Sequence, residues 1–377
     1  MSTDPAAPDS ADASDGDREL IDEVEDVDET DAVAQSANPV SYFGTEFDVH
    51  GLVRRYNERA ILVPTFDPAE TLPDPNAQPF QRGRVWRRPQ QDRFLESLLL
   101  GFPVPGIFLV EQPGKKYLVL DGQQRLTTLA SFYAGKFRLE AVDASLKGLT
   151  YDSLPGDLRR TLDDTFIQAI IIRAPQSVQE YESVYQIFER LNSGGTNLTP
   201  HEIRVALYGG ELVDTIRELN NNESWRALYG RRSDRLKDQE LILRIIALHE
   251  SSATYYSPLK TFLNDFLGQH RNGEGLNLPR LSAVFAAAAA TLEYSIGRRA
   301  FRLRTQVNAA ILDAVFVAAM ERIFASPIEE LDPAKWAAAY DGLLKNSRFI
   351  DAVTKATANE ESVEARLAEA RAAFATV

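Results

Sequence analysis

The sequence predicts an α+β fold, with a mixed core in its N-terminal half and a mostly helical C-terminal extension. Short β-rich runs at residues 107–111, 116–120 and 166–172 alternate with stretches of helical periodicity. From Glu211 onward, apolar residues recur almost throughout at spacings of three and four, as on the buried face of a helix. We therefore divide the chain into an acidic disordered tail (1–39), a core (40–210) and a helical domain (211–377).

Acidic residues dominate the predicted tail. Residues 1–31 contain 13 acidic side chains and one basic side chain, so most of the formal net charge of −14 lies there. A segment with so much charge and so few apolar residues cannot bury enough surface to fold. It is either a solubilising tail or a nucleic-acid mimic that covers a basic site on the same protein. The remainder is close to neutral, so its basic clusters can still attract phosphates.

Composition excludes several classes of protein. The chain has no cysteine, and therefore no disulfide framework and no cysteine metal site. No apolar run approaches the roughly 18 residues that a membrane helix needs, so we expect no membrane partner. The N-terminus shows no basic segment followed by an apolar stretch, as a secretory signal would. We expect a cytoplasmic protein.

Local signals set the elements of the core. A helix is expected over 90–100, because its apolar residues share one face and Gly101 follows as a typical helix end. The turn at 112–115 should join the first two strands into a hairpin. Further helices are expected over 123–133, over 177–191 and after the cap formed by Thr199 and Pro200.

The second strand of the hairpin ends in Asp121-Gly122, directly before a helix. A glycine at such a turn lets the backbone come close to a ligand. The N–H groups of the first helical turn lack intrahelical partners, and the helix dipole favours an anion beside them. Arg125 adds a planar fork that matches phosphate oxygens. The turn is therefore a candidate phosphate site, distinct from a Walker loop, whose Gly-Lys-Ser/Thr ending is missing.

Side chains around this turn suit nucleotide chemistry. Gln123 and Gln124 can donate to and accept from a phosphate, a base or a water. Asp121 can accept from a ribose hydroxyl, hold magnesium through water or orient a nucleophile. The same residues also fit a purely structural role, in which Asp121 caps the helix and Arg125 forms a surface ion pair.

Four stretches in fixed order carry a wider resemblance. They are residues 80–86 (FQRGRVW), 95–105 (LESLLLGFPVP), 117–129 (YLVLDGQQRLTTL) and 188–200 (FERLNSGGTNLTP). Together they resemble the GmrSD-type restriction endonuclease N-terminal domain family, which looks like a relative of ParB nucleotide-binding domains. We expect the match to extend over about residues 40–320.

The resemblance implies a ParB/sulfiredoxin-like core that binds and hydrolyses a nucleoside triphosphate with Mg²⁺ or another divalent metal. Independently of the resemblance, Glu189 and Asn192 are three residues apart at a helix end and share a face, although they also fit a solvated helix terminus. The candidate residues are Asp121, Gln123, Gln124 and Arg125 for catalysis, Gln81, Arg82, Gly122 and Arg190 for nucleotide binding, and Glu189 and Asn192 for the metal.

Basic clusters in the extension are candidate nucleic-acid contacts. Arg298 and Arg299 are followed by Arg302 and Arg304, and a second cluster lies at 231–237. Either set could track a phosphate backbone or form a solvated helix face. We take Arg298 and Arg299 as the candidates for DNA.

The preferred function is a nucleoside-triphosphate hydrolase module of a restriction or anti-phage system that acts on or with DNA. The four histidines form no pair at the i, i+4 spacing of a helical zinc site, and no His-Asn-His nuclease pattern is visible. Cleavage of DNA would therefore need a separate nuclease subunit. The alternatives are a non-catalytic ParB-like adaptor that binds nucleotide or DNA and recruits a nuclease, and a nicking enzyme built on the same core.

Overall fold

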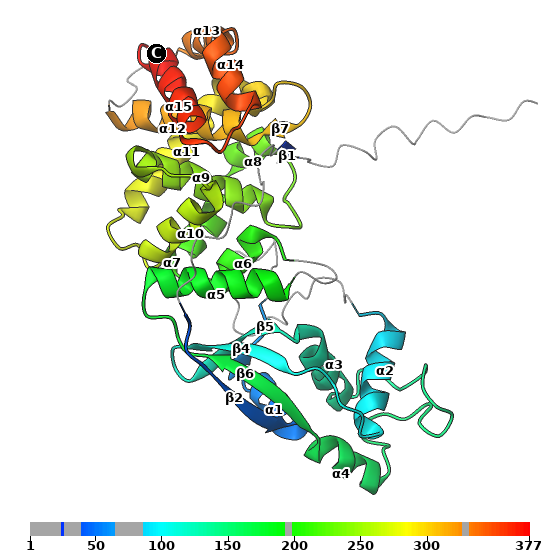
Figure 1. Ribbon diagram of the computed structural model, residues 1–377. Coiled ribbons are helices and arrows are strands. Elements are labelled where there is room, and N and C mark those ends of the chain that lie inside the picture. Colours follow the sequence, from blue (N-terminus) through cyan, green and yellow to red (C-terminus); the bar gives the residue numbers. More distant parts are fainter. Residues whose placement is uncertain (1–23, 26–38, 65–85, 193–197, 326–331) are drawn as a thin grey trace, which may run out of the picture.

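The computed structural model describes residues 24–25, 39–64, 86–192, 198–325 and 332–377 (Figure 1). A sheet with flanking helices forms one end of the molecule, and a stack of helices extends from it to the C-terminus (Figure 1). This arrangement confirms the predicted α+β fold with a helical C-terminal extension. No helix in these ranges is long and apolar enough to cross a bilayer.

The sheet has five strands in the order β2-β6-β4-β5-β3. Pairing is antiparallel for β2 with β6 and for β4 with β5, and parallel for β4 with β6 and for β3 with β5. The predicted hairpin is β4–β5, and Gly114 adopts φ +78° in its turn. The strands are β2 (Tyr42–Asp48), β3 (Ile61–Leu62), β4 (Ile107–Gln112), β5 (Lys116–Asp121) and β6 (Phe166–Ile172).

The two faces of the sheet belong to different cores, because successive side chains of a strand point to opposite sides. Leu109, Val119 and Ile171 pack under four helices of the N-terminal half. Val110 and Leu120 on the other face pack with the helix that follows β6. The first set of helices is α1 (Val49–Asn57), α2 (Arg88–Leu99), α3 (Gln123–Tyr133) and α4 (Gly156–Asp164), and the helix after β6 is α5 (Val178–Leu191).

The second core runs without a break from the sheet into the C-terminal helices. A single hydrophobic cluster includes Val110 of β4 and Phe374 of the last helix. The structure does not test the predicted domain boundary at 210–211, which stays a prediction. The remaining elements are α6 (Pro200–Leu207), α7 (Glu211–Leu219), α8 (Glu223–Tyr229), α9 (Lys237–Ser251), η1 (Ser252–Thr254), α10 (Leu259–Gln269), α11 (Leu278–Ser295), η2 (Gly297–Phe301), β7 (Val307–Asn308), α12 (Ala309–Ala325), α13 (Pro333–Leu343), α14 (Ser347–Thr354) and α15 (Glu360–Phe374).

One short piece of the predicted tail is described. Strand β1 (Val24–Glu25) pairs in parallel with β7. Apart from Val24, Glu25 and residue 39, the predicted acidic tail lies outside the described residues.

A buried ion cluster ties the C-terminal helices together. Asp313 of α12 accepts hydrogen bonds from Arg244 of α9 at 2.8 Å and from Arg366 of α15 at 2.9 Å. All three side chains are at most 3% exposed. Buried charges persist only when they are paired and hydrogen-bonded in this way. The cluster thus fixes the relative positions of helices that are far apart in the sequence.

Candidate functional site

The turn between β5 and α3 has a backbone shape that requires glycine. Gly122 is the N-cap of α3 and adopts φ +97°, a left-handed conformation that costs other residues energy. A Cβ atom on Gly122 would lie 2.5 Å from Cγ2 of Ile107. The glycine therefore allows the turn to pack closely against the start of β4.

The first turn of α3 presents backbone donors without acceptors. Leu126 is the first residue whose N–H is satisfied, by the carbonyl of Gly122 at 3.0 Å. Within the described ranges, no acceptor faces the N–H groups of Gln123, Gln124 and Arg125. Such amides carry the positive end of the helix dipole, so this end of α3 attracts an anion.

Arg125 points inward from the same turn. Its Nη2 donates to Oδ2 of Asp121 at 2.6 Å and to the carbonyl of Gly106 at 2.9 Å. The ion pair of the structural alternative is therefore present; its carboxylate, Asp121, is 41% exposed, whereas the Arg125 side chain is 13% exposed. The alternative in which Asp121 caps α3 is wrong, because Gly122 is the N-cap and no side chain caps the helix.

Part of the Arg125 guanidinium has no partner among the described residues. Its Nε is buried and has no hydrogen-bond acceptor there. A Cβ atom on Gly122 would lie 3.4 Å from this nitrogen, so the unsatisfied donor lies beside the glycine. A buried charged donor left without a partner costs about 1–3 kcal/mol or more. An anionic ligand at the turn would remove this cost.

Trp86 contacts the turn from the chain that precedes α2. Its backbone N–H donates to Oε1 of Gln124 at 3.4 Å. The Trp86 ring packs edge-on against Phe94 of α2, with ring centroids 5.5 Å apart. The candidates Gln81 and Arg82 lie outside the described residues, so their predicted role in nucleotide binding stays a prediction.

The C-terminal end of α5 lies next to the end of β5. Asn192 is the C-cap of α5, and its Nδ2 donates to the carbonyl of Phe188 at 2.8 Å and to that of Leu120 at 3.4 Å. The second contact joins the stretch 188–200 directly to the stretch 117–129. Arg190 lies on the exposed side of the last turn of α5. The fold therefore brings Asn192, three residues after Glu189, to the end of β5 beside the β5–α3 turn.

Lys260 is a residue that the sequence analysis missed. This first-turn residue of α10 donates from its Nζ to Glu189 Oε1 at 2.9 Å and Oε2 at 3.2 Å. No local motif marks the lysine, because the pair forms only when α10 packs on α5. The helical extension thus places a cation one helical turn from Asn192.

A polar network holds α10 in this position. Asn264 donates to Glu182 of α5 at 2.8 Å and accepts from Arg204 of α6 at 2.7 Å. Arg204 also donates to the carbonyl of Lys260 at 3.3 Å. Burial raises the pKa of the Glu182 carboxyl above its usual range, against the hydrogen bond from Asn264. The backbone that carries Lys260 is therefore fixed by contacts to two other helices.

The oxygen donors fit a magnesium ion that arrives with a ligand. In the described part of the chain, no three acidic or histidine side chains form a metal-binding group. Asp121 and Glu189 are each already paired with a cation. Magnesium commonly keeps several waters and binds through one or two carboxylates and substrate phosphates, so a preformed cage is not needed. Glu189 and Asn192 supply ligand types suited to that mode.

The basic candidates of the extension lie in and after η2. Arg299 forms an ion pair with Asp341 and lies over the ring of Tyr340, 5.3 Å from its centroid. Arg302 donates to the carbonyl of Leu228 at 2.9 Å, so it stabilises the fold. Arg298 is exposed. The predicted DNA contact of Arg298 and Arg299 stays a prediction.

Residues 73–209 match the family model of the GmrSD restriction endonuclease, N-terminal domain. Over these residues the chain is similar to the GmrSD-type N-terminal domain. The matched residues include the β5–α3 turn and the end of α5, whereas Lys260 lies beyond them. The resemblance expected over 40–320 is thus confirmed for its central part. Neither a search of curated proteins nor a search of solved structures found a match, so the ParB/sulfiredoxin-like relationship stays a prediction.

Proposed function

We propose that the GmrSD-type domain binds and hydrolyses a nucleoside triphosphate at the β5–α3 turn, as one module of a DNA restriction system. The observation that carries this proposal is the group of unsatisfied donors around Gly122. The amides of Gln123 to Arg125 and the buried Nε of Arg125 lack acceptors in the described structure. A triphosphate tail supplies oxygen acceptors and the negative charge that such a site favours.

In the proposed reaction, the phosphates lie on the first-turn amides of α3. The guanidinium of Arg125 neutralises charge that grows on the transferred phosphoryl group. Asp121 and the Gly106 carbonyl hold the guanidinium in place. Gln123 or Gln124 orients the attacking water by hydrogen bonding. Glu189 and Asn192 would hold a divalent metal, which supplies further charge neutralisation when bound.

The restriction role rests on the family description, which names a restriction endonuclease. A system of this kind acts on DNA, and the sequence shows no nuclease pattern of its own. We therefore include a separate nuclease subunit and DNA as partners in the proposal. Hydrolysis at the turn would be coupled to that partner through α5, which contacts both the sheet and the C-terminal helices.

A non-catalytic adaptor is the second candidate. It is favoured by the ion pairs that engage both carboxylates of the site, Asp121 with Arg125 and Glu189 with Lys260. With both carboxylates neutralised, the site would bind a nucleotide without activating water.

One assay separates the proposals. The purified protein is incubated with Mg²⁺ and each of the four ribonucleoside triphosphates, and phosphate release is measured, with plasmid DNA added in parallel. Phosphate release without nicking supports the hydrolase. Tight nucleotide binding with neither product supports the adaptor, and nicking by the chain alone contradicts both in favour of a nicking enzyme.

We also assign to Lys260, the cation beside Glu189, a hydrogen bond to the bound triphosphate. Lys260→Ala is therefore expected to raise the KM for the triphosphate about tenfold, since a charge-assisted hydrogen bond contributes about 1.5–3 kcal/mol. Thermal stability should change little, because the Lys260–Glu189 pair is 32% and 40% exposed. Steady-state kinetics and a melting curve test both expectations. Lys355→Ala removes another lysine–carboxylate pair, with Asp351, which is more exposed at 73% and 63%, and it is the control. Equal KM values for the two variants would remove Lys260 from the site.

A further inference from the structure

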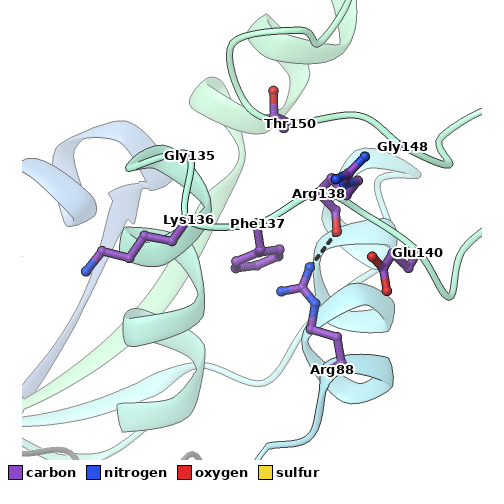
Figure 2. A pocket seen from close by; sticks show the side chains of 8 residues that line it. All are labelled: Arg88, Gly135, Lys136, Phe137, Arg138, Glu140, Gly148 and Thr150. Carbon is purple, nitrogen blue, oxygen red and sulfur yellow. Dashed lines mark hydrogen bonds between the residues drawn. The ribbon is translucent and has the colours of Figure 1, made fainter.

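A cavity of about 550 Å³ opens at the end of α3 opposite the phosphate turn (Figure 2). With 11 residues, α3 separates the cavity from the turn by about 16 Å. The cavity is therefore distinct from the proposed nucleotide site. Its lining residues are Arg88, Gly135, Lys136, Phe137, Arg138, Glu140, Gly148 and Thr150.

Positive charge predominates in this cavity. Three basic side chains, Arg88, Lys136 and Arg138, line it together with one acidic side chain, Glu140. Of the three, Arg88 is paired with the buried Asp92 at 3.8 Å. In the part of the chain that the structure describes, the side chains of Lys136 and Arg138 make no ion pair or hydrogen bond. Both are exposed. Two unneutralised cations at the rim of a hollow attract a ligand that carries separate negative charges.

Arg88 gives the cavity a fixed wall. Its guanidinium lies over the ring of Phe137, 3.6 Å from the centroid, and donates to the backbone carbonyl of Arg138 (Figure 2). Phe137 itself is only 9% exposed. Because the guanidinium is held by the ring and the carbonyl, the loop that carries Lys136 and Arg138 is tied to the start of α2. The two rim cations therefore project from an anchored segment.

The rim is open at two glycines. A Cβ atom built on Gly135 or on Gly148 would meet no other atom within 4 Å. The opening leaves room for a ligand that continues beyond the cavity on both sides. An extended polyanion meets this description better than a compact ligand, which would need walls on most sides.

We propose that this cavity, which we call the Lys136–Arg138 pocket, binds the phosphate backbone of duplex DNA through Lys136 and Arg138. The proposal rests on the proposed restriction function for its choice of DNA as the polyanion. Each of the two cations contacts one phosphate, and contacts of this kind give affinity without reading the base sequence. Glu140 repels the DNA phosphates. Removing its charge should therefore strengthen binding, whereas removing the charge of Lys136 or Arg138 should weaken it.

The test measures binding of a labelled duplex by fluorescence anisotropy over a series of salt concentrations. Lys136→Glu combined with Arg138→Glu is expected to weaken binding at least tenfold at low salt. It should lower the slope of log affinity against log salt by about 2, because each lost phosphate contact removes about 0.9. Glu140→Gln is expected to tighten binding several-fold, an effect that damage to the fold would not produce.

Arg298→Glu combined with Arg299→Glu is the comparison variant, since it reverses charge on the other basic surface. Wild-type affinity and slope for the pocket variants, with loss only in the comparison variant, would overturn the proposal. Displacement of DNA by excess ATP from an Arg125→Ala protein, whose phosphate turn is disabled, would also overturn it by showing that the pocket takes free nucleotide.

Hydrolysis measured without DNA keeps this test separate from the proposed function. The pocket variants should release phosphate from the triphosphate at the wild-type rate, because the pocket lies at the far end of α3. A protein that binds DNA through the pocket but hydrolyses nothing would sink the hydrolase proposal and leave the pocket standing.

Discussion

Arg125→Ala is expected to lower nucleoside-triphosphate turnover about 100- to 1000-fold, the usual cost of losing a donor that stabilises a transition state. The guanidinium is the one cation that the β5–α3 turn itself provides, and Asp121 and the Gly106 carbonyl fix its direction. The loss should appear mainly in kcat, because charge on the phosphoryl oxygens develops as the bond to the leaving phosphate breaks. Steady-state phosphate release under saturating Mg²⁺ and nucleotide measures it.

The same substitution removes two hydrogen bonds, one to Asp121 of β5 and one to the carbonyl of Gly106 just before β4, so stability needs its own control. Arg173→Ala removes the ion pair between Arg173 of the segment after β6 and Glu111 of β4, on the same sheet. It should leave turnover unchanged. Arg125→Lys retains a charge without the planar fork and should recover only part of the activity. Wild-type turnover in folded Arg125→Ala would show that the guanidinium has no part in phosphate chemistry.

Gly122→Ala is expected to abolish turnover and to destabilise the fold by about 2–5 kcal/mol. A left-handed backbone costs a non-glycine residue about 1–2 kcal/mol, and forcing a methyl group into a packed site costs about 1–3 kcal/mol more. The new Cβ atom would lie 2.5 Å from Ile107 Cγ2, so the turn must move away from β4. That movement redirects the first-turn amides of α3. Chemical unfolding and phosphate release measure the two effects.

Gly114→Ala is the matched control for Gly122→Ala. Gly114 has φ +78° in the β4–β5 hairpin, but a Cβ atom there would meet nothing within 4 Å. The control therefore carries the strain of a left-handed alanine without the steric clash, and it should keep full turnover. If both variants lose the same stability and neither loses activity, the close approach at Gly122 has no functional meaning.

Elements whose signals are local were predicted with accurate limits. The helix over 123–133 and the strand over 166–172 have the same bounds in the structure, since each is a periodic run with clear breaks at its ends. Strand β2 and helix α1 were not predicted. Gly44 weakens the strand signal of the β2 sequence, and the strand lies at the edge of the sheet, where its residues are exposed or half-buried and give a weak pattern.

The candidate site likewise has a part that local sequence predicts and a part that depends on tertiary packing. Residues 121–125 are contiguous, so their turn geometry follows from the strand-glycine-helix pattern. Lys260 was missed because only tertiary packing brings α10 to Glu189. The Lys136–Arg138 pocket was missed for the same reason, since the start of α2 and the end of α3 meet only in the folded chain. Arg302 is an error of the opposite kind. Its place in a basic cluster suggested a nucleic-acid contact, but its side chain donates to backbone carbonyls of the protein itself.

A crystal structure of the protein with Mg²⁺ and a non-hydrolysable nucleoside-triphosphate analogue would decide whether the β5–α3 turn is a phosphate site. We expect phosphate oxygens about 2.7–3.2 Å from the backbone nitrogens of Gln123 to Arg125 and from Nε of Arg125. Density for the analogue elsewhere on the chain, with the turn and its guanidinium unchanged and without a ligand, would contradict the proposed function.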